Sequence, residues 1–340
     1  MVREPLRSWM LVLSTCAATS VGCAPAPSDG APAPVNVVRR EQLGADWACA
    51  SPDDCTADYL RFLDLAADHA RPLDAATLDA RVVAIGAGDV PLAVEPLAAD
   101  ALADAIVEAT GIGFLLEDLD ARELQVVTVG RGGTDSYDEA ELLLTDPLLG
   151  TFKGILLMPK GEGPFPAVVA VHGHPESAEV FRDLHHGAEF PSRGYAILML
   201  TMRVMAIDDV EREMSWRLLE QGFSLVGLRV VEALLGLKVL RTEPRVDADR
   251  IGLIGHSGGA SASNLTVRLE PRLRAYVSDN QVDWFRSGED EPYHCETVPG
   301  LYPLHARIND FSTSATPIDP VLYGFLGAFP GVFDFFDRNL

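Results

Sequence analysis

The chain has 340 residues, 48% hydrophobic and 23% charged, which is enough for one large or two modest globular domains. Lys and Arg number 27 against 50 Asp and Glu, so the net charge is −23. Phosphate backbones and anionic lipid headgroups repel such a polyanion, and we therefore expect no nucleic-acid partner.

The first 23 residues have the pattern of an export signal. Arg3 and Arg7 precede an apolar stretch at 8–21, which is shorter than the ~20 apolar residues of an ordinary membrane-spanning helix. The stretch ends in Ser-Val-Gly-Cys23, which resembles the lipobox of bacterial lipoproteins. That resemblance implies lipidation of Cys23, with ordinary secretory cleavage as the alternative. We expect an exported protein of the bacterial cell envelope, periplasmic or on the outer surface, held to a membrane only by an N-terminal lipid anchor.

The cysteines beyond the signal fit an exported protein. Residues 24–40 begin with an Ala-Pro-rich sequence that predicts an extended tether. Cys49 and Cys55 then flank a turn-forming Ala-Ser-Pro-Asp-Asp, so we expect a disulfide between them in an oxidising compartment. The alternative is two separate thiols, and a metal site here is disfavoured because no His lies within ten residues. Cys295 is then the odd cysteine, and we expect it to be buried.

Residues 41–121 are expected to form an acidic helical segment. Ala-rich sequences near 57–65 and 98–107 place apolar side chains three and four positions apart, which is typical of amphipathic helices. The string Val-Val-Ala-Ile-Gly-Ala-Gly at 82–88 contains two glycines of a dinucleotide-binding turn, but Pro91 occupies the position of the third. We interpret 82–88 as a short strand and turn that binds no cofactor.

From residue 122 onward, apolar runs alternate with helical patterns. Runs with alternating polarity predict half-buried strands, and continuous apolar runs predict buried parallel strands. This alternation predicts an α/β fold with a doubly wound, mostly parallel sheet and helices on both of its faces. The predicted strands lie at 124–129, 152–158, 167–171, 195–200, 251–254 and 273–277, with a strand-like run at 320–325, and the predicted helices lie at 178–192, 214–241 and 259–269.

The sequence Gly255-His-Ser257-Gly-Gly259 follows the buried run at 251–254 and precedes a helical pattern. G-x-S-x-G between a strand and a helix is typical of a nucleophile elbow, a turn so sharp that its serine adopts a strained backbone conformation. Small residues two positions before and after the serine permit the close approach of the chain, and the helix directs the positive end of its dipole at the reacting centre. The sequence predicts Ser257 as a nucleophile, with a structural glycine-rich turn as the alternative.

Two further motifs accompany this turn. Pro-Ala-Val-Val-Ala-Val-His172-Gly precedes one helical pattern, and Arg193-Gly-Tyr-Ala precedes the next strand. Together with the elbow, they resemble the α/β-hydrolase family, in its branch of dienelactone hydrolases, acetylxylan esterases and prolyl-oligopeptidase-like proteins. The resemblance covers residues 122–280 and implies an α/β-hydrolase fold for a domain at 122–340.

The resemblance also implies an oxyanion hole built from two backbone N–H groups. One follows the nucleophile and belongs to Gly258, and the other follows His172-Gly and belongs to His174. His172 and His174 could instead ligate a metal, but metallohydrolases of the H-x-H-x-D type need Asp where this chain has Glu176. We therefore expect neither a metal nor a cofactor. Three other histidines are expected on the solvated surface, namely His69, His185 and His186.

The family pattern breaks after Ser257, where an acid and then a base should follow. The G-x-x-D and H-G-F sequences of the family are missing, and only His294 and His305 follow the serine. His294 lies in a stretch that resembles a structural part of the esterase branch, so we predict His305 as the base. We predict Asp283 as the orienting acid in preference to Asp279. The alternatives to this rewired triad are a hydrolase that lost its base and a chain with a shortened family tail.

The sequence therefore predicts an exported serine hydrolase that acts on a small-molecule carboxylic ester without a cofactor. Ser257 would attack the carbonyl carbon, and the N–H groups of Gly258 and His174 would hold the oxyanion. The runner-up is a catalytically impaired hydrolase-like protein that serves as a surface binding or scaffold module. A serine peptidase is a third interpretation, which depends on analogy with the family.

Overall fold

The computed structural model describes residues 36–37, 61–93, 95–205, 208–279, 284, 295–320 and 325–340, all of which belong to one compact unit, Pro32–Leu340. Cys23, Cys49 and Cys55 lie outside the described residues, and with them the predicted lipid anchor and disulfide. Within the described part of the chain, no helix is both long and apolar enough to cross a membrane.

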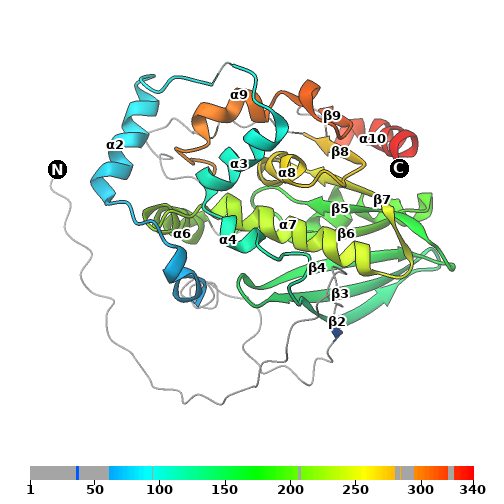
Figure 1. The fold of residues 1–340 in the computed structure, drawn as a ribbon. Helices are drawn as coiled ribbons and strands as arrows, with labels where there is room; N and C mark the ends of the chain where they lie inside the picture. Colours follow the sequence, from blue (N-terminus) through cyan, green and yellow to red (C-terminus); the bar gives the residue numbers. More distant parts are fainter. Residues whose placement is uncertain are drawn as a thin grey trace, which may run out of the picture. The chain divides into compact units, whose positions relative to one another are not determined.

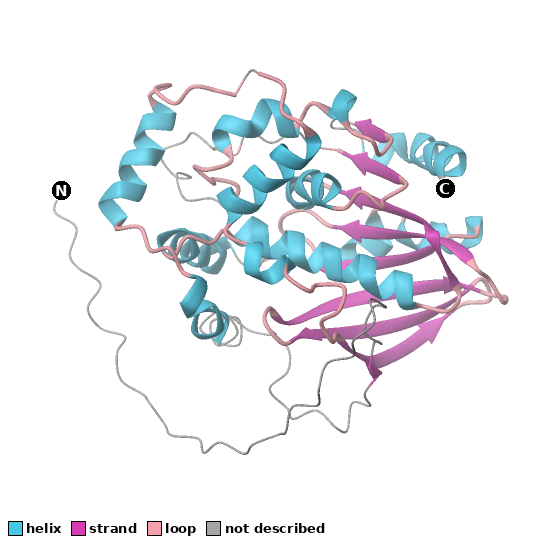
Figure 2. Cartoon of the chain, viewed as in Figure 1, coloured by secondary structure: helices cyan, strands magenta, loops and turns pink. Residues whose placement is uncertain are grey.

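A nine-stranded sheet runs through the described residues in the order β1-β2-β3-β4-β6-β5-β7-β8-β9 (Figures 1 and 2). The neighbours β2, β3, β4 and β6 pair antiparallel, whereas β6, β5, β7, β8 and β9 form a parallel half. The predicted α/β fold with a mostly parallel sheet is confirmed. The strands are β1 Asn36–Val37, β2 Gln125–Gly133, β3 Tyr137–Asp146, β4 Gly150–Pro159, β5 Phe165–Val171, β6 Ala196–Thr201, β7 Val246–Gly255, β8 Ala275–Ser278 and β9 Ile318–Pro320.

Helices cover both faces of the parallel half, because its strands are apolar on both sides. Alternate residues of β5 and β6 belong to two separate apolar cores. One core contains α7 (Leu225–Thr242) and α8 (Gly258–Leu269). The other contains α5 (Ala178–Leu184), a 3₁₀ helix (Gly187–Arg193) and α10 (Phe325–Asn339). The carboxyl ends of the central strands therefore lie between two helical layers.

The helical pattern at 214–241 forms two helices instead of one. α6 (Asp208–Glu220) ends before Gly222, which has a φ of +84° that favours glycine. α7 then begins with an N-cap, because the Ser224 hydroxyl accepts a hydrogen bond of 3.1 Å from Gly227 N. After this turn, α7 packs against β5, β6 and β7 of the sheet, whereas α6 packs against α7 and α2.

The stretch 82–88, predicted as a strand and turn, is instead the end of a helix. α2 (Ala75–Gly86) buries Leu78, Val82 and Ile85, which recur at helical spacing and outweigh the local β-branched sequence. Two other predictions are also corrected. The pattern at 178–192 divides into α5 and the 3₁₀ helix, and the late run at 320–325 does not form one strand, since β9 ends at Pro320 and α10 begins at Phe325.

The acidic segment packs closely on the helices that follow it. α2 contacts α6, and α3 (Ala99–Thr110) contacts α7 and α8 (Figure 1). Gly111 ends α3 at a φ of +71°, and a Cβ there would lie only 2.1 Å from the carbonyl oxygen of Gly222. Ser224 N also donates to the Thr110 carbonyl at 3.0 Å. The short elements are α4 Gly113–Leu116, α9 His305–Ile308 and 3₁₀ turns at Ala67–His69, Tyr302–Leu304 and Phe311–Thr313.

Candidate active site

A tight turn joins β7 to α8 around Ser257. β7 ends at Gly255, α8 begins at Gly258, and Ser257 between them has φ 48° and ψ −119°. A residue with a side chain rarely adopts such a positive φ, and backbone strain of this kind costs on the order of 1–3 kcal/mol. Glycine is required nearby, because a Cβ at Gly259 would lie 2.4 Å from the carbonyl oxygen of Val171.

Asp279 follows β8 and holds this turn from the neighbouring strand. Its Oδ1 accepts a hydrogen bond of 2.6 Å from Ser257 N, and its Oδ2 is bonded to His256 Nδ1. Burial alone would lower the pKa of His256, but the Asp279 carboxylate raises it above the ordinary value. Asp279 thus lies at the elbow, whereas Asp283, the acid preferred from the sequence, lies outside the described residues.

The loop after β5 lies beside the turn because β5 and β7 are parallel neighbours. His172 is fully buried there, its Nδ1 is 2.8 Å from the Gly173 carbonyl oxygen, and its Nε2 is 3.0 Å from Met202 N. Since Nε2 accepts from a backbone N–H, Nδ1 carries the proton of a neutral imidazole. Burial lowers the pKa of His172 to about 4, so this ring is a neutral structural group. A Cβ at Gly173 would lie 2.7 Å from Ser257 Cβ.

His174 extends from the same loop toward α6 and α7. Its Nε2 is 2.8 Å from Glu211 Oε1 and 3.5 Å from Cys295 Sγ. The same Glu211 oxygen is 2.5 Å from Arg229 Nη2, and both of these residues are buried. Burial alone would raise the pKa of Glu211, but the Arg229 guanidinium and the hydrogen bond with His174 lower it far below the ordinary value. Burial raises the pKa of the Cys295 thiol, which is buried as expected.

A second imidazole–carboxylate group lies on the other side of the elbow. Glu176 Oε1 is 2.6 Å from His185 Nε2 and 3.7 Å from His256 Nε2, and the rings of His185 and His256 are 4.4 Å apart. Burial alone would raise the pKa of Glu176, but its hydrogen bond with His185 lowers it. His185 is 5% exposed, so its predicted place on the solvated surface is wrong. His185 is the C-cap residue of α5, and its ring is held inside by the contact with Glu176.

Comparisons with known proteins agree with this architecture. No protein-family model matches the chain. The esterase FrsA of Salmonella paratyphi B is 32% identical over 148 residues, which are 43% of this chain and 32% of that protein. The esterase EstD of Thermotoga maritima is 28% identical over 151 residues, 42% of this chain and 31% of that protein. The chain thus spans about a third of the length of these two esterases.

Among solved structures, the acetyl xylan esterase from Paenibacillus sp. R4 superposes with a TM-score of 0.51 and 15% identity, over 74% of this chain and 97% of that one. The chain has the α/β-hydrolase fold. At 15% identity, the superposition shows a shared fold and no shared chemistry.

Within this α/β-hydrolase fold, the predicted base lies in a short helix between β8 and β9 of the chain. His305 begins α9, its Nδ1 is 3.1 Å from the Tyr302 carbonyl oxygen, and its ring packs on that of Tyr302 with centroids 5.6 Å apart. Both contacts are with Tyr302, in the 3₁₀ turn that directly precedes His305. His294, the reserve candidate, lies outside the described residues.

Two groups of side chains have donor atoms close enough together for a metal ion in the described part of the chain. In one of them, His174, Glu211 and Cys295, the carboxylate is already paired with the buried guanidinium of Arg229, which would repel a cation. In the other, Glu176 with His185 and His256, the 2.6 Å separation is that of a hydrogen bond and is shorter than the ligand spacing around a tetrahedral ion. In each group, the short distance between the side chains is explained by a hydrogen bond between an imidazole and a carboxylate.

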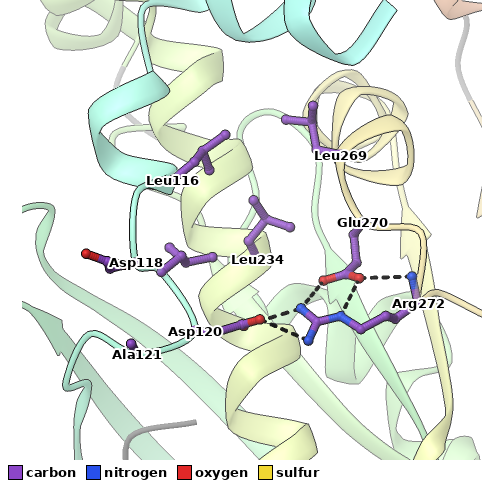
Figure 3. Close-up of a pocket in the computed structure, with 9 residues that line it drawn as sticks. Leu116, Asp118, Asp120, Ala121, Leu234, Leu269, Glu270 and Arg272 are labelled. Carbon is purple, nitrogen blue, oxygen red and sulfur yellow. Dashed lines mark hydrogen bonds and ion pairs between the residues drawn. The ribbon is translucent and has the colours of Figure 1, made fainter. Parts of the chain in front are cut away.

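A cavity of about 370 Å³ lies at the far end of α8 (Figure 3). Arg272 crosses it, with contacts of 2.9 Å to Glu270 and 3.0 Å to Asp120. α8 has twelve residues and is therefore ~18 Å long, and this length separates the cavity from Ser257. The cavity is lined by residues away from the elbow, which are Leu116, Asp118, Leu119, Asp120, Ala121, Leu234, Leu269, Glu270 and Arg272.

Proposed function

We propose that the chain is a serine hydrolase of carboxylic esters, with Ser257 as the nucleophile. The observation that carries this proposal is the backbone of Ser257, at φ 48° and ψ −119° directly before the first residue of α8. A strained serine at a strand-to-helix turn, with a helix N-terminus behind it, fits the role of a nucleophile better than that of a packing residue. FrsA and EstD carry the name esterase, which supports the reaction class.

The surrounding hydrogen bonds support two particular N–H groups as oxyanion donors. At the elbow, Ser257 N is bonded to Asp279 and Gly259 N to the His256 carbonyl, so the donor is Gly258 N at the start of α8. In the facing loop, Gly173 N is bonded to Glu176 and Pro175 has no N–H, so the donor is His174 N. One such donor contributes ~3–4 kcal/mol of transition-state stabilisation in comparable sites.

The reaction would proceed through an acyl-enzyme. Ser257 Oγ forms a bond to the carbonyl carbon while its proton passes to a base, and collapse of the oxyanion breaks the bond to the leaving alcohol, which takes that proton. Water then attacks the acyl-enzyme by the same route and releases the carboxylic acid. No cofactor enters either step.

The setting of the proposed reaction is the bacterial cell envelope. An exported chain, tethered through lipid on Cys23, would meet small-molecule esters at a membrane surface. Its acidity, with 27 Lys and Arg against 50 Asp and Glu, argues against nucleic acid as a partner.

A serine-directed probe and a chromogenic ester test the proposal. We expect a fluorophosphonate to label the wild type at Ser257, and we expect hydrolysis of p-nitrophenyl acetate to disappear in Ser257→Ala with an unchanged melting temperature. Ser192→Ala is the matched control, because the Ser192 hydroxyl is exposed and bonded to the Glu189 carbonyl oxygen. A wild type that neither reacts with the probe nor hydrolyses any ester would leave the binding or scaffold function as the better account.

A further inference from the structure

His174 has a defined tautomer. Its Nε2 is 2.8 Å from Glu211 Oε1, and an ionised carboxylate only accepts hydrogen bonds. In the neutral imidazole the proton therefore sits on Nε2, and Nδ1 carries the lone pair. Glu211 is 3% exposed and is fixed by Arg229 Nη2 at 2.5 Å, so the carboxylate that sets this tautomer is itself anchored.

The lone pair of Nδ1 faces the elbow. A Cβ built on Gly258 would lie 2.2 Å from His174 Nδ1 and 2.3 Å from its Cε1, so this edge of the ring is against the residue that follows Ser257. The same loop touches Ser257 itself through Gly173. With a carboxylate at one nitrogen and the residue after Ser257 against the other, this imidazole lies where a base that activates the serine is needed.

We propose that the His174 side chain is the general base of the reaction, with Glu211 as its positioning carboxylate. This inference rests on the proposed function. Nδ1 takes the proton of Ser257 Oγ as the bond to the acyl carbon forms, and it then gives that proton to the leaving alkoxide. In deacylation it takes a proton from the attacking water and returns it to Ser257 Oγ. Glu211 stabilises the transient imidazolium without changing its own protonation.

The other described imidazoles near the elbow are turned to different partners. Both nitrogens of His172 are engaged by the backbone at Gly173 and Met202. His256 directs Nδ1 to Asp279 and Nε2 toward Glu176, and His185 is bonded to Glu176. Three charged or titratable groups lie around the His174 ring. They are Glu211 on α6, Arg229 on α7 and Cys295 at the start of the segment 295–320.

The main experiment compares kcat and KM for p-nitrophenyl acetate in His174→Gln, His305→Gln and the control His186→Gln. Gln at 174 keeps the backbone N–H and can still bond Glu211, so only the base is lost. We expect kcat to fall about 10³-fold in His174→Gln, with KM within a few-fold of the wild type. His186 lies on the same stretch of chain, bonded to Glu189, and its replacement should leave kcat unchanged.

Two further measurements separate a base from a structural residue. Added imidazole should restore activity at least tenfold in His174→Ala, because it can enter the space of the lost ring. In Glu211→Gln, the acid limb of the pH–kcat profile should move to lower pH, since the imidazolium loses its carboxylate. Circular dichroism and melting curves establish that each variant is folded.

The outcomes distinguish this inference from the proposed function. If Ser257→Ala abolishes hydrolysis but His174→Gln retains more than a third of wild-type kcat, the base assignment is wrong and the serine hydrolase stands. A large loss in His305→Gln with none in His174→Gln transfers the role to His305. If the wild type hydrolyses no ester, both proposals fail together.

Discussion

His172 and His174 are two positions apart, yet their surroundings give the two imidazoles different properties. The His172 ring is enclosed, and both its nitrogens are satisfied by backbone groups. The His174 ring is 17% exposed and contacts a charged carboxylate. Burial keeps the His172 imidazole neutral, whereas the His174 ring is hydrogen-bonded to the Glu211 carboxylate. One histidine therefore shapes the loop, and the other has the contacts of a proton acceptor.

The burial of His172 predicts a loss of stability in acid. Its pKa is lowered to about 4 in the folded protein against 6.5 for an exposed His, so between these values the unfolded chain binds a proton that the folded chain does not. Stability should fall as the pH drops from 6.5 to 4, by about 3 kcal/mol for this residue at 1.36 kcal/mol per pKa unit. Urea denaturation across this range should show a shallower pH dependence in His172→Gln than in the wild type. His186→Gln serves as the reference, and an equal slope in all three proteins would contradict the prediction.

The nucleophile candidate can be found from the sequence, because the elbow and the loop after β5 are local motifs. Ser257, Gly258 and His174 are each identified by their immediate neighbours in the chain. Glu211 and Arg229 have no local sequence motif. They lie on two different helices, and only the packing of α6 and α7 brings them next to His174. The local motif therefore predicts only a backbone role for His174, and no local pattern indicates the carboxylate that is bonded to its ring.

At the scale of elements, the buried strands of the parallel half were predictable, because continuous apolar runs have few alternatives in an α/β chain. β3 (Tyr137–Asp146) was missed, since its first half alternates weakly and lies at a solvated part of the sheet. The break between α6 and α7 has a local signal in Gly222 and Ser224 that outweighs the helical pattern around it. The predicted element boundaries were wrong where a turn residue, and not the hydrophobic pattern, determines the end of a helix.

The contact between α3 and the α6–α7 turn should be sensitive to a single methyl group. Gly111 and Gly88 both have positive φ, +71° and +77°, so alanine introduces similar backbone strain of about 1 kcal/mol at each. At Gly111 the new Cβ would also meet the Gly222 carbonyl, whereas nothing lies within 4 Å at Gly88. We expect Gly111→Ala to cost about 2–4 kcal/mol of unfolding free energy, and Gly88→Ala about 1 kcal/mol. Urea midpoints measure both, and equal losses would mean that the two segments are not packed as described.

At the scale of the whole molecule, the net charge of −23 limits how the protein can be held at a membrane. Anionic headgroups repel such a chain, so electrostatic adsorption of the protein to a membrane is unfavourable. The proposed anchor and the acidic composition are consistent in this respect. Attachment would then depend on one residue.

We propose that Cys23 is that residue. In a bacterial host, Cys23→Ser should move the protein from the membrane fraction to the soluble fraction, and intact-mass measurement should show loss of the lipid mass. Cys16→Ser is the matched control, because Cys16 lies within the apolar stretch and not at its end. An unchanged distribution of Cys23→Ser between the fractions would refute lipidation.

The pairing of β5 with β7 has a consequence for the order in which the protein folds. Val171 and Gly255 are register partners although they are far apart in the chain, and the two loops of the site follow directly from them. Contacts between segments so distant form slowly, because a long loop must close before they are gained. The strained conformation of Ser257 persists only within that surrounding structure. If Ser257 is the proposed nucleophile, its reactivity toward a fluorophosphonate should therefore appear in the last phase of refolding, after most helical structure has formed. The rate at which labelling appears would then measure how fast the sheet is completed.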